Sequence, residues 1–355
     1  MIFLLYGCAN VCAIKKHTAM SRATIKDVAQ LAQVSTTTVS HVVNNTRAVN
    51  PATRARVLGA MSTLGYQPNI LARSLRKGVT KTIGLIVPDA SNPFFAEVAR
   101  KIEDLGFKQG YSVILCNSDN DPIKQTSYIN TLLAKRVDGV IFISSDSAPS
   151  DLSRLVDNHI PLVVADRDVS LEFADVVLLD NERAGYEATR HLLELGHRNI
   201  ACITGPYDLS PSMQRMEGFK RCLSEFGIQF QPQLIQTGDF SIQSGKVATL
   251  RLLSAGPKPT AIFALNDMMA IGAMSAVNQA GLSIPGDMSL IGFDNIELAG
   301  MVTPSLTTVA QPIPEIARQA TSLLIERLAG TRNGSNQKVI LSAELLLRDS
   351  TARLE

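Results

Sequence analysis

The feature that most constrains the fold of this chain is an alternation of short apolar runs with longer amphipathic segments. Buried-strand patterns such as Thr82–Val87 and Ile200–Thr204 alternate with helical patterns such as Phe95–Phe107 and Arg183–Leu195. A βαβ alternation of this kind requires parallel sheets that helices cover on both faces. Further strands are predicted at Tyr111–Cys116, Gly139–Ser144, Pro161–Ala165, Ala261–Ala264 and Ser289–Gly292.

The alternating region extends over about 265 residues, which is more than one sheet with a single hydrophobic core usually holds. We therefore expect two lobes, each with its own parallel sheet. Hydrophobic residues make up 45% of the chain and charged residues 19%, a balance typical of a globular protein with a large core. Apolar runs in the sequence stay below the roughly 18 residues that a membrane span needs.

The N-terminal part of the chain differs in charge from the rest. Residues 21–78 contain eight Lys or Arg and one acid, Asp27. The formal net charge of the whole chain is only +2, so the residues after Gly78 carry a net negative charge. A compact basic segment on an acidic body is typical of a protein that contacts phosphate through that segment. A solvated basic helix face is the alternative interpretation.

Three helix starts lie within this basic segment. Thr24 and Asp27 have the spacing of a capping box, Ser35 can cap a second helix, and Asn50-Pro51 is a third start. Three short helices with a tight second turn predict a helix-turn-helix motif. The apolar residues expected to face inward are Ile25, Val28, Ala29, Leu31, Ala32, Val39, Val42, Val43, Val57, Leu58, Met61 and Leu64.

The second of these helices exposes short polar side chains that suit base edges in the major groove, Thr36, Thr37 and His41. The sequences at residues 23–29 (ATIKDVA) and 34–44 (VSTTTVSHVVN) strongly resemble the LacI/GalR repressor family, and the resemblance extends to about residue 347. It implies a bacterial transcription regulator with a reading surface similar to that of the purine and ribose repressors. The DNA contacts that it implies are Thr24, Ser35, Thr36, Thr37, His41, Asn44, Arg47, Arg73 and Leu75.

The resemblance also implies a domain order. Residues 1–20 are interpreted as a non-native N-terminal extension and residues 21–68 as the helix-turn-helix DNA-binding domain. Residues 69–78 match a hinge helix that folds on DNA, because two turns are too short to be stable alone. Leu75 matches the leucine that wedges into the minor groove, with a core contact to the sensor domain as the alternative. Residues 79–347 form the effector-binding domain, with lobe 1 at 79–181 and 310–340 and lobe 2 at 182–309.

This second domain of the family resembles periplasmic sugar-binding proteins, which hold their ligand in the cleft between two similar lobes. Ligands on open parallel sheets lie at the carboxyl ends of the strands. Carboxylates, amides and guanidinium groups suit a neutral polyol, because sugar hydroxyls both donate and accept hydrogen bonds. The residues at these strand ends match a ribose-type pocket: Asn92, Phe94, Phe95, Asp166, Arg167, Arg215, Phe240, Asn266, Asp294 and Gln311.

Other effectors stay open at this point. A purine pocket matches less well, because its loop after the strand at 200–204 carries a polar or basic pair where this chain has Leu209 and Pro211. A protein corepressor is a further alternative. The aromatic residues Phe95 and Phe240 can equally be core residues rather than ligand contacts.

Functions outside transcription regulation find less support in the sequence. It lacks a G-x-S-x-G elbow, a Walker lysine and an H-E-x-x-H motif, so we predict no enzyme, no catalytic residue, no metal and no cofactor. An enzyme acting on sugars would need an acid–base pair such as Asp166 and Asp294. We expect neighbouring arginines and amides to hold both carboxylates ionised, and Asp166 with Arg167 can be an ordinary ion pair. A sugar-transport protein that is cut before Cys8 and lipid-anchored is the remaining alternative, which the basic helix-turn-helix disfavours.

The expected partners are palindromic operator DNA, a small sugar and a second copy of the chain, because a two-fold symmetric protein reads a palindrome. No membrane partner is expected, and the protein is placed in the cytoplasm. Five cysteines without zinc spacing fit buried, reduced thiols. His191 and His197 are interpreted as surface or helix-capping residues.

Overall fold

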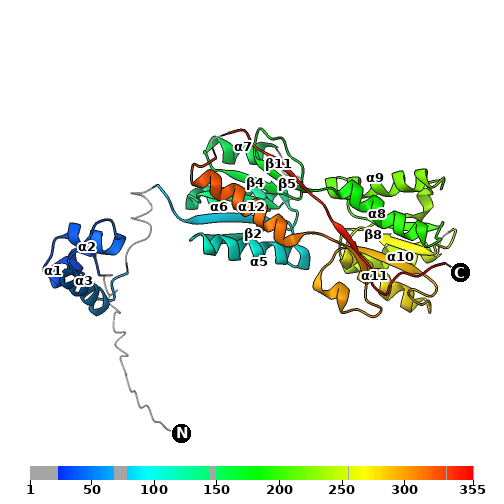
Figure 1. Cartoon of the computed structure of the whole chain (residues 1–355), viewed down its shortest axis with the longest axis horizontal. Helices are drawn as coiled ribbons and strands as arrows, with labels where there is room; N and C mark the ends of the chain where they lie inside the picture. The colour runs from blue at the N-terminus through cyan, green and yellow to red at the C-terminus, as the bar shows by residue number, and fades with distance from the viewer. Residues whose placement is uncertain (1–22, 68–77, 144–148, 255, 333, 355) are drawn as a thin grey trace, which may run out of the picture. The chain divides into compact units, whose positions relative to one another are not determined.

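The computed structural model describes residues 23–67, 78–143, 149–254, 256–332 and 334–354. The chain divides into two compact units, residues 1–79 and residues 80–355, which are described separately. Figure 1 shows helices alone in the first unit and sheets flanked by helices in the second. This fold class, a helical domain joined to a two-lobed domain with parallel sheets, is the one predicted from the sequence.

The described part of the first unit contains α1 (Ile25–Ala32), α2 (Thr36–Asn44) and α3 (Pro51–Thr63). The predicted capping box is present: the Thr24 amide donates to the Asp27 carboxylate at 2.7 Å, and the Asp27 amide donates to the Thr24 hydroxyl at 3.4 Å. Asn50 caps α3 through the Ala52 amide at 2.9 Å. These N-caps mark where α1 and α3 begin, because they bond first-turn amides that have no partner within the helix.

The core of the three-helix unit is smaller than predicted. Val28, Val39 and Val57 are fully buried, but Leu31 and Leu58 were predicted to face inward and are 50% and 48% exposed. The reason is helical geometry: each residue advances about 100° around the axis. Leu58 directly follows the buried Val57 and therefore leaves the packed face. Leu31 lies outside the buried face of α1, which Val28, Ala29 and Ala32 form.

Lobe 1 of the second unit is a parallel sheet with strand order β11-β5-β4-β3-β1-β2. Its apolar residues alternate between two faces: Ile83 and Leu85 pack in one cluster, whereas Ile86 and Phe142 pack in another. Helices α5 and α12 cover the first face and α6 and α7 the second. The bounds are β1 Thr82–Val87, α5 Pro93–Lys108, β2 Ser112–Asn117, α6 Pro122–Lys135, β3 Gly139–Ile143, α7 Pro149–Asp157, β4 Leu162–Ala165, β5 Asp175–Leu179, α12 Ile313–Leu328 and β11 Lys338–Leu341.

Lobe 2 repeats the architecture with strand order β12-β10-β9-β8-β6-β7, in which only the pairing of β10 with β12 is antiparallel among the described strands. Helices α8 and α9 lie together, as do α10 and α11. Two 3-10 turns, η1 and η2, complete the lobe. The bounds are α8 Asn181–Glu194, β6 Ile200–Thr204, α9 Ser210–Glu225, η1 Pro232–Leu234, β7 Ile235–Thr237, α10 Ile242–Ser254, β8 Ala261–Ala264, α11 Asp267–Gln279, β9 Ser289–Asp294, η2 Glu297–Gly300, β10 Thr307–Ala310 and β12 Glu344–Leu346.

The chain passes between the lobes three times, from β5 to α8, from β10 to α12 and from β11 to β12. Figure 1 shows the last passage as the red segment that runs from β11 into the second lobe. The residues after β12 stay with lobe 2, where the Ser350 hydroxyl donates to the Leu290 carbonyl at 2.6 Å and the Leu354 amide donates to the Leu195 carbonyl at 2.9 Å. A ligand that contacts one of these three connections can therefore affect how the two lobes sit relative to each other.

Glycines let the paired helices of lobe 2 approach closely. A Cβ on Gly185 of α8 would lie 2.3 Å from the Arg215 carbonyl oxygen, and a Cβ on Gly218 of α9 would lie 2.0 Å from the Glu182 carbonyl oxygen. The two helices therefore pack backbone against backbone. This packing fixes the first turns of α8 and α9 relative to each other, and with them Asn181 and Arg215.

The prediction for the cysteines agrees with the structure, whereas the prediction for His197 does not. Cys116, Cys202 and Cys222 are free and buried, as expected, whereas Cys8 and Cys12 lie outside the described residues. The interpretation of His197 as a surface or capping residue is wrong. His197 is 3% exposed and makes hydrogen bonds to the Thr260 and Ser289 hydroxyls, each at 3.0 Å. It joins the ends of β8 and β9 to the C-terminal segment.

Candidate functional site

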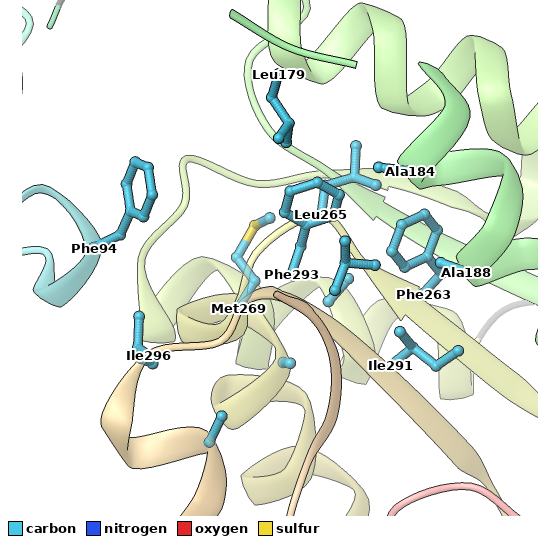
Figure 2. Packing of buried hydrophobic residues seen from close by; sticks show 14 of the residues in the cluster. Phe94, Leu179, Ala184, Ala188, Phe263, Leu265, Met269, Ile291, Phe293 and Ile296 are labelled. Carbon is cyan, nitrogen blue, oxygen red and sulfur yellow. The ribbon is translucent and has the colours of Figure 1, made fainter. Parts of the chain in front are cut away.

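The first predicted effector residues lie where β1 gives way to α5. Asn92 is buried, and its side-chain oxygen accepts a hydrogen bond from the Phe94 amide at 3.0 Å, which caps α5. The Phe94 ring meets Phe95 edge to face, with centroids 5.0 Å apart. Phe95 lines an apolar groove of about 310 Å³ between α5 and the edge strand β2. Figure 2 shows Phe94 apart from the packed aromatic cluster of lobe 2.

The end of β4 carries a buried ion pair. The Arg167 guanidinium donates to the Asp166 carboxylate at 2.9 Å, and both side chains are less than a tenth exposed. The Nε of Arg167 is buried and has no hydrogen-bond partner among the described residues. A buried donor left unpaired destabilises the fold unless something binds it. This nitrogen is therefore a candidate ligand contact.

Arg215 of α9 is held by two hydrogen bonds, an aromatic ring and a nearby carboxylate. Its Nε donates to the Asn181 side chain at 2.8 Å and its Nη1 to the Leu265 carbonyl at 2.6 Å. The guanidinium lies 3.5 Å from the centroid of the Phe293 ring, and its Nη1 is 4.0 Å from the Asp294 carboxylate. Burial lowers the pKa of Arg215 to about 10, so the group stays charged at neutral pH.

Asp294 ends β9, and its carboxylate accepts a hydrogen bond from the Gln311 side chain at 2.8 Å. The Gln311 side-chain oxygen is buried without a partner among the described residues. Burial raises the pKa of Asp294, against the lowering effect of Arg215. Burial therefore opposes the neighbouring groups that were expected to hold this carboxyl ionised, because removing a carboxylate from water disfavours its charged form.

Phe240 and Asn266 come together in lobe 2. The Asn266 side-chain nitrogen donates to the Phe240 carbonyl at 3.0 Å, while its oxygen accepts from the Met269 amide at 2.9 Å and caps α11. The Phe240 ring lies where a Cβ on Gly205 would be, 2.1 Å from its nearest atom. The loop after β6 therefore needs glycine at this position to admit the ring.

Backbone conformation sets three of the predicted residues apart. Asp166, Phe240 and Asp294 have φ values of 72°, 69° and 113°, a region that residues other than glycine seldom adopt. Such strain persists where the surrounding structure imposes it, and it concentrates at ligand-binding positions. The charges of Asp166 and Arg167 in lobe 1 also act on the pKa of Arg215 in lobe 2. The predicted polar residues of the two lobes thus form one electrostatic group.

Asp267 is not among the ten residues matched to the ribose-type pocket, and it is fully buried at the start of α11. Its carboxylate accepts hydrogen bonds from the Thr308 hydroxyl at 2.6 Å and the Ile296 amide at 2.9 Å. Asp267 thereby holds the strained loop that follows Asp294. Its position directly after Asn266 at a strand end was the available signal, but an ordinary helix start gives the same pattern.

Two further buried hydroxyls were also missed. The Thr204 and Ser212 side chains, at the end of β6 and in the first turn of α9, have no hydrogen-bond partner among the described residues. Ser212 lies on the same helix as Arg215, less than one turn before it. Nothing in the sequence distinguishes them from ordinary serine and threonine.

The predicted DNA-reading residues cluster on and around α2. Thr36 and Thr37 are exposed in its first turn, and the His41 Nδ1 lies 2.9 Å from the Thr46 hydroxyl. Three others serve the fold, at least in part: Thr24 caps α1, Ser35 caps α2 through the Thr38 amide, and Asn44 donates to the Ser40 carbonyl. Arg47 is exposed, whereas Arg73 and Leu75 lie outside the described residues.

Comparison with known protein families accounts for both units. A model of bacterial regulatory proteins of the lacI family matches residues 24–69. A model of periplasmic binding proteins and the sugar-binding domain of the LacI family matches residues 80–348. The chain belongs to the LacI family. It is therefore a DNA-binding transcription regulator, and not an enzyme, with a separate effector-binding domain.

Relatives within the LacI family carry names and titles that point to different ligands. The repressor PurR of Aliivibrio salmonicida is 44% identical over 307 residues, covering 86% of this chain and 92% of that protein. A LacI-family regulator of Enterococcus faecium, solved with bound ribose, is 36% identical with a TM-score of 0.71 and covers 77% of this chain and all of that one. The lac repressor dimer bound to operator is 29% identical with a TM-score of 0.83, covering 93% and 99%.

Membrane spans and metal sites are both absent from the part of this LacI-family chain that the structure describes. No described helix combines the length and the apolar character that crossing a membrane needs. Across the same residues, no three His, Cys, Asp or Glu side chains group in a way that could hold a metal ion.

Proposed function

We propose that this repressor responds to a small neutral sugar, with a ribose-like pentose as the best candidate, bound between its two lobes. The chain's DNA-binding and effector-binding units follow from its family; the sugar is the proposal. We also propose that the protein acts in the cytoplasm, where a transcription regulator meets its DNA.

The observation that carries this proposal is that two of the predicted effector residues have buried hydrogen-bonding atoms without partners, one a donor and one an acceptor. Arg167 offers a buried donor, Nε, and Gln311 offers a buried acceptor, its side-chain oxygen, and both lack partners among the described residues. A sugar hydroxyl donates and accepts at once, so it suits such a pair. Buried polar groups of this kind make a site select against ligands that cannot bond to them.

The charges of the same residues favour a neutral ligand. Asp166 is paired with Arg167, and Asp294 lies beside Arg215. An added phosphate or carboxylate would meet a buried acid as closely as a buried guanidinium. The ribose-bound relative at 36% identity supports the same class of effector.

A purine is the second candidate, and the similarity to the PurR repressor at 44% identity is what favours it. The loop after β6 argues against it. There Leu209 is 7% exposed and Pro211 has no amide hydrogen to donate, at the two positions where a purine-type pocket carries a polar or basic pair. A base edge would find fewer partners in this loop than sugar hydroxyls find at the strand ends.

Calorimetry on the full chain separates these candidates. Ribose should release heat on titration into the wild-type protein, and the Asp294→Ala variant should show a weaker signal or none. Guanine and hypoxanthine titrated under the same conditions should be silent. Heat from a purine together with silence from ribose would replace the sugar by a base and leave the regulator itself unchallenged.

We further propose that the protein acts as a homodimer on a palindromic operator. The apolar groove between α5 and β2 supports this, because it lies at a sheet edge where Leu115 is 51% exposed. An open apolar strand edge is commonly covered by another chain. The similarity to the lac repressor, solved as a dimer on its operator, points to a second copy as the cover. Sedimentation of a single monomeric species at micromolar concentration would contradict it.

A further inference from the structure

The last turn of α2 carries a contact between two side chains that the functional assignment does not use. The His41 Nδ1 lies 2.9 Å from the Thr46 hydroxyl. The chain can make this contact because Asn45, which ends the helix, adopts the left-handed conformation with φ 51° and ψ 35°. The backbone then turns back along the helix end, which returns Thr46 to the level of His41.

The turn that holds Thr46 is itself supported from a second helix. The Arg54 guanidinium of α3 donates to the Asn45 side chain at 3.2 Å. The Asn44 side-chain nitrogen donates to the Ser40 carbonyl at 2.9 Å, and the Asn44 side-chain oxygen has no hydrogen-bond partner among the described residues, so neither atom bonds to the imidazole. Thr46 is thus placed by the left-handed turn at Asn45 and by the hydrogen bond that ties this turn to α3, whereas the His41 ring alone would rotate freely about its side-chain bonds.

We propose that Thr46 positions the His41 imidazole for reading a base, leaving Nε2 as the nitrogen that meets the base edge. A histidine has two distinct ring nitrogens, and the partner of one determines the role of the other. With Nδ1 held by Thr46, the ring plane is fixed and only Nε2 remains for the major groove. This inference rests on the assignment of α2 as the reading helix.

The contact gains importance when α2 enters DNA. In free protein the two side chains are partly exposed, and water competes for both groups. A base pair in the groove excludes that water, and a hydrogen bond strengthens in the drier environment. Thr46 therefore affects specificity without contacting DNA itself, by reducing the freedom that His41 must lose on binding.

The test uses the full-length protein and an operator obtained by selecting duplexes from a randomised library with the wild-type protein. Each base pair of the selected site is then replaced in turn, and binding is measured for wild type, His41→Ala, Thr46→Val, Thr46→Ser and the double variant His41→Ala/Thr46→Val. Valine matches threonine in shape but lacks the hydroxyl, and serine retains it. Thermal unfolding of each variant reports whether the fold is intact.

Thr46→Val should weaken operator binding by roughly three- to tenfold and flatten discrimination at the same base pair as His41→Ala. Thr46→Ser should restore most of the preference. The double variant should bind no more weakly than His41→Ala alone, because coupled residues are not additive. Random-sequence DNA should be bound equally by all variants.

Additive losses, equal loss on random DNA, or a Thr46→Val variant that matches wild type would each overturn the role of Thr46. If the His41→Ala variant discriminates between base pairs as the wild-type protein does at every position, the reading role of His41 is overturned as well. The two failures are therefore distinguishable in one set of measurements.

Discussion

The Gln311 side chain donates to the Asp294 carboxylate across 2.8 Å, and this bond joins a lobe crossing to a predicted effector contact. Gln311 lies in the passage from β10 to α12, and Asp294 ends β9. A ligand that bonds to either residue therefore acts on a segment that connects the lobes. The ligand changes the lobe arrangement, and with it DNA binding, only if it binds one arrangement more tightly than the other.

Gln311→Ala should weaken ribose binding by about tenfold, the scale for loss of one hydrogen bond to a charged or buried group. It removes a predicted sugar contact and leaves the Asp294 carboxyl without its amide donor. Calorimetry with ribose measures the loss. Gln319→Ala on α12, the helix that follows Gln311, removes a glutamine that bonds Glu315 instead, and it should bind ribose as wild type does. Equal affinities for all three proteins would remove Gln311 from the site.

Replacing Asp294 by asparagine should change how stability depends on pH. Burial raises the pKa of Asp294 above its ordinary value of 3.8, so the folded state prefers the neutral carboxyl. The stabilisation from that preference is complete below the ordinary pKa and is lost as pH rises through the raised value. Wild-type protein should therefore lose melting temperature relative to Asp294→Asn as the pH rises from 3.8, the ordinary pKa, through the raised pKa of Asp294.

The control for that comparison is Asp208→Asn, which removes an exposed carboxylate from the nearby loop. Its melting temperature should track that of wild type across the same pH range. An Asp294→Asn curve parallel to wild type would show that Asp294 titrates in the fold as it does in the unfolded chain.

Arg215→Ala should be the more damaging of two arginine substitutions on α9. It leaves the Asn181 side chain, the Leu265 carbonyl and Asp294 without their guanidinium partner. We expect ribose affinity to fall by roughly ten- to a hundredfold, with a lower melting temperature. Arg221→Ala removes an arginine that is half exposed on the same helix and should leave ribose binding unchanged. Equal losses of ribose affinity in the two variants would mean that removing a positive charge, and not the contacts of Arg215, weakens binding.

The sequence predicted the elements that depend on local pattern. The strands at Ile200–Thr204 and Ala261–Ala264 match the structure residue for residue, because continuous apolar runs between helices have few alternatives. β5 was missed since it follows β4 without a helix between them. β7 and β12 were missed because three residues carry no periodicity.

Long-range contacts were harder to predict. The burial of His197 depends on residues more than sixty positions away, among them Thr260 and Ser289. The strand-end rule found Asp294 and Gln311 but could not show which of their atoms would lack partners. It also gave no reason to expect that burial would raise the pKa of Asp294 beside Arg215, since desolvation depends on the packed neighbourhood and not on residue type.

Leu75→Ala should weaken operator binding by a few kcal/mol, the scale of one unstacked base step and the contacts it permits. Binding to random DNA should hardly change, because Arg73, Arg76 and Lys77 still provide positive charge for phosphates. Fluorescence anisotropy with both DNAs measures the two affinities. A similar loss on both would assign Leu75 to a protein core instead of the minor groove.

The most direct test of the account is a titration of ribose into the complex of the full-length protein with its selected operator, followed by anisotropy of the labelled DNA. We predict release of the operator by ribose, and no release from the Asp294→Ala variant at the same concentrations. Operator binding that ribose leaves unchanged, and that guanine or hypoxanthine strengthens, would contradict a sugar-controlled repressor.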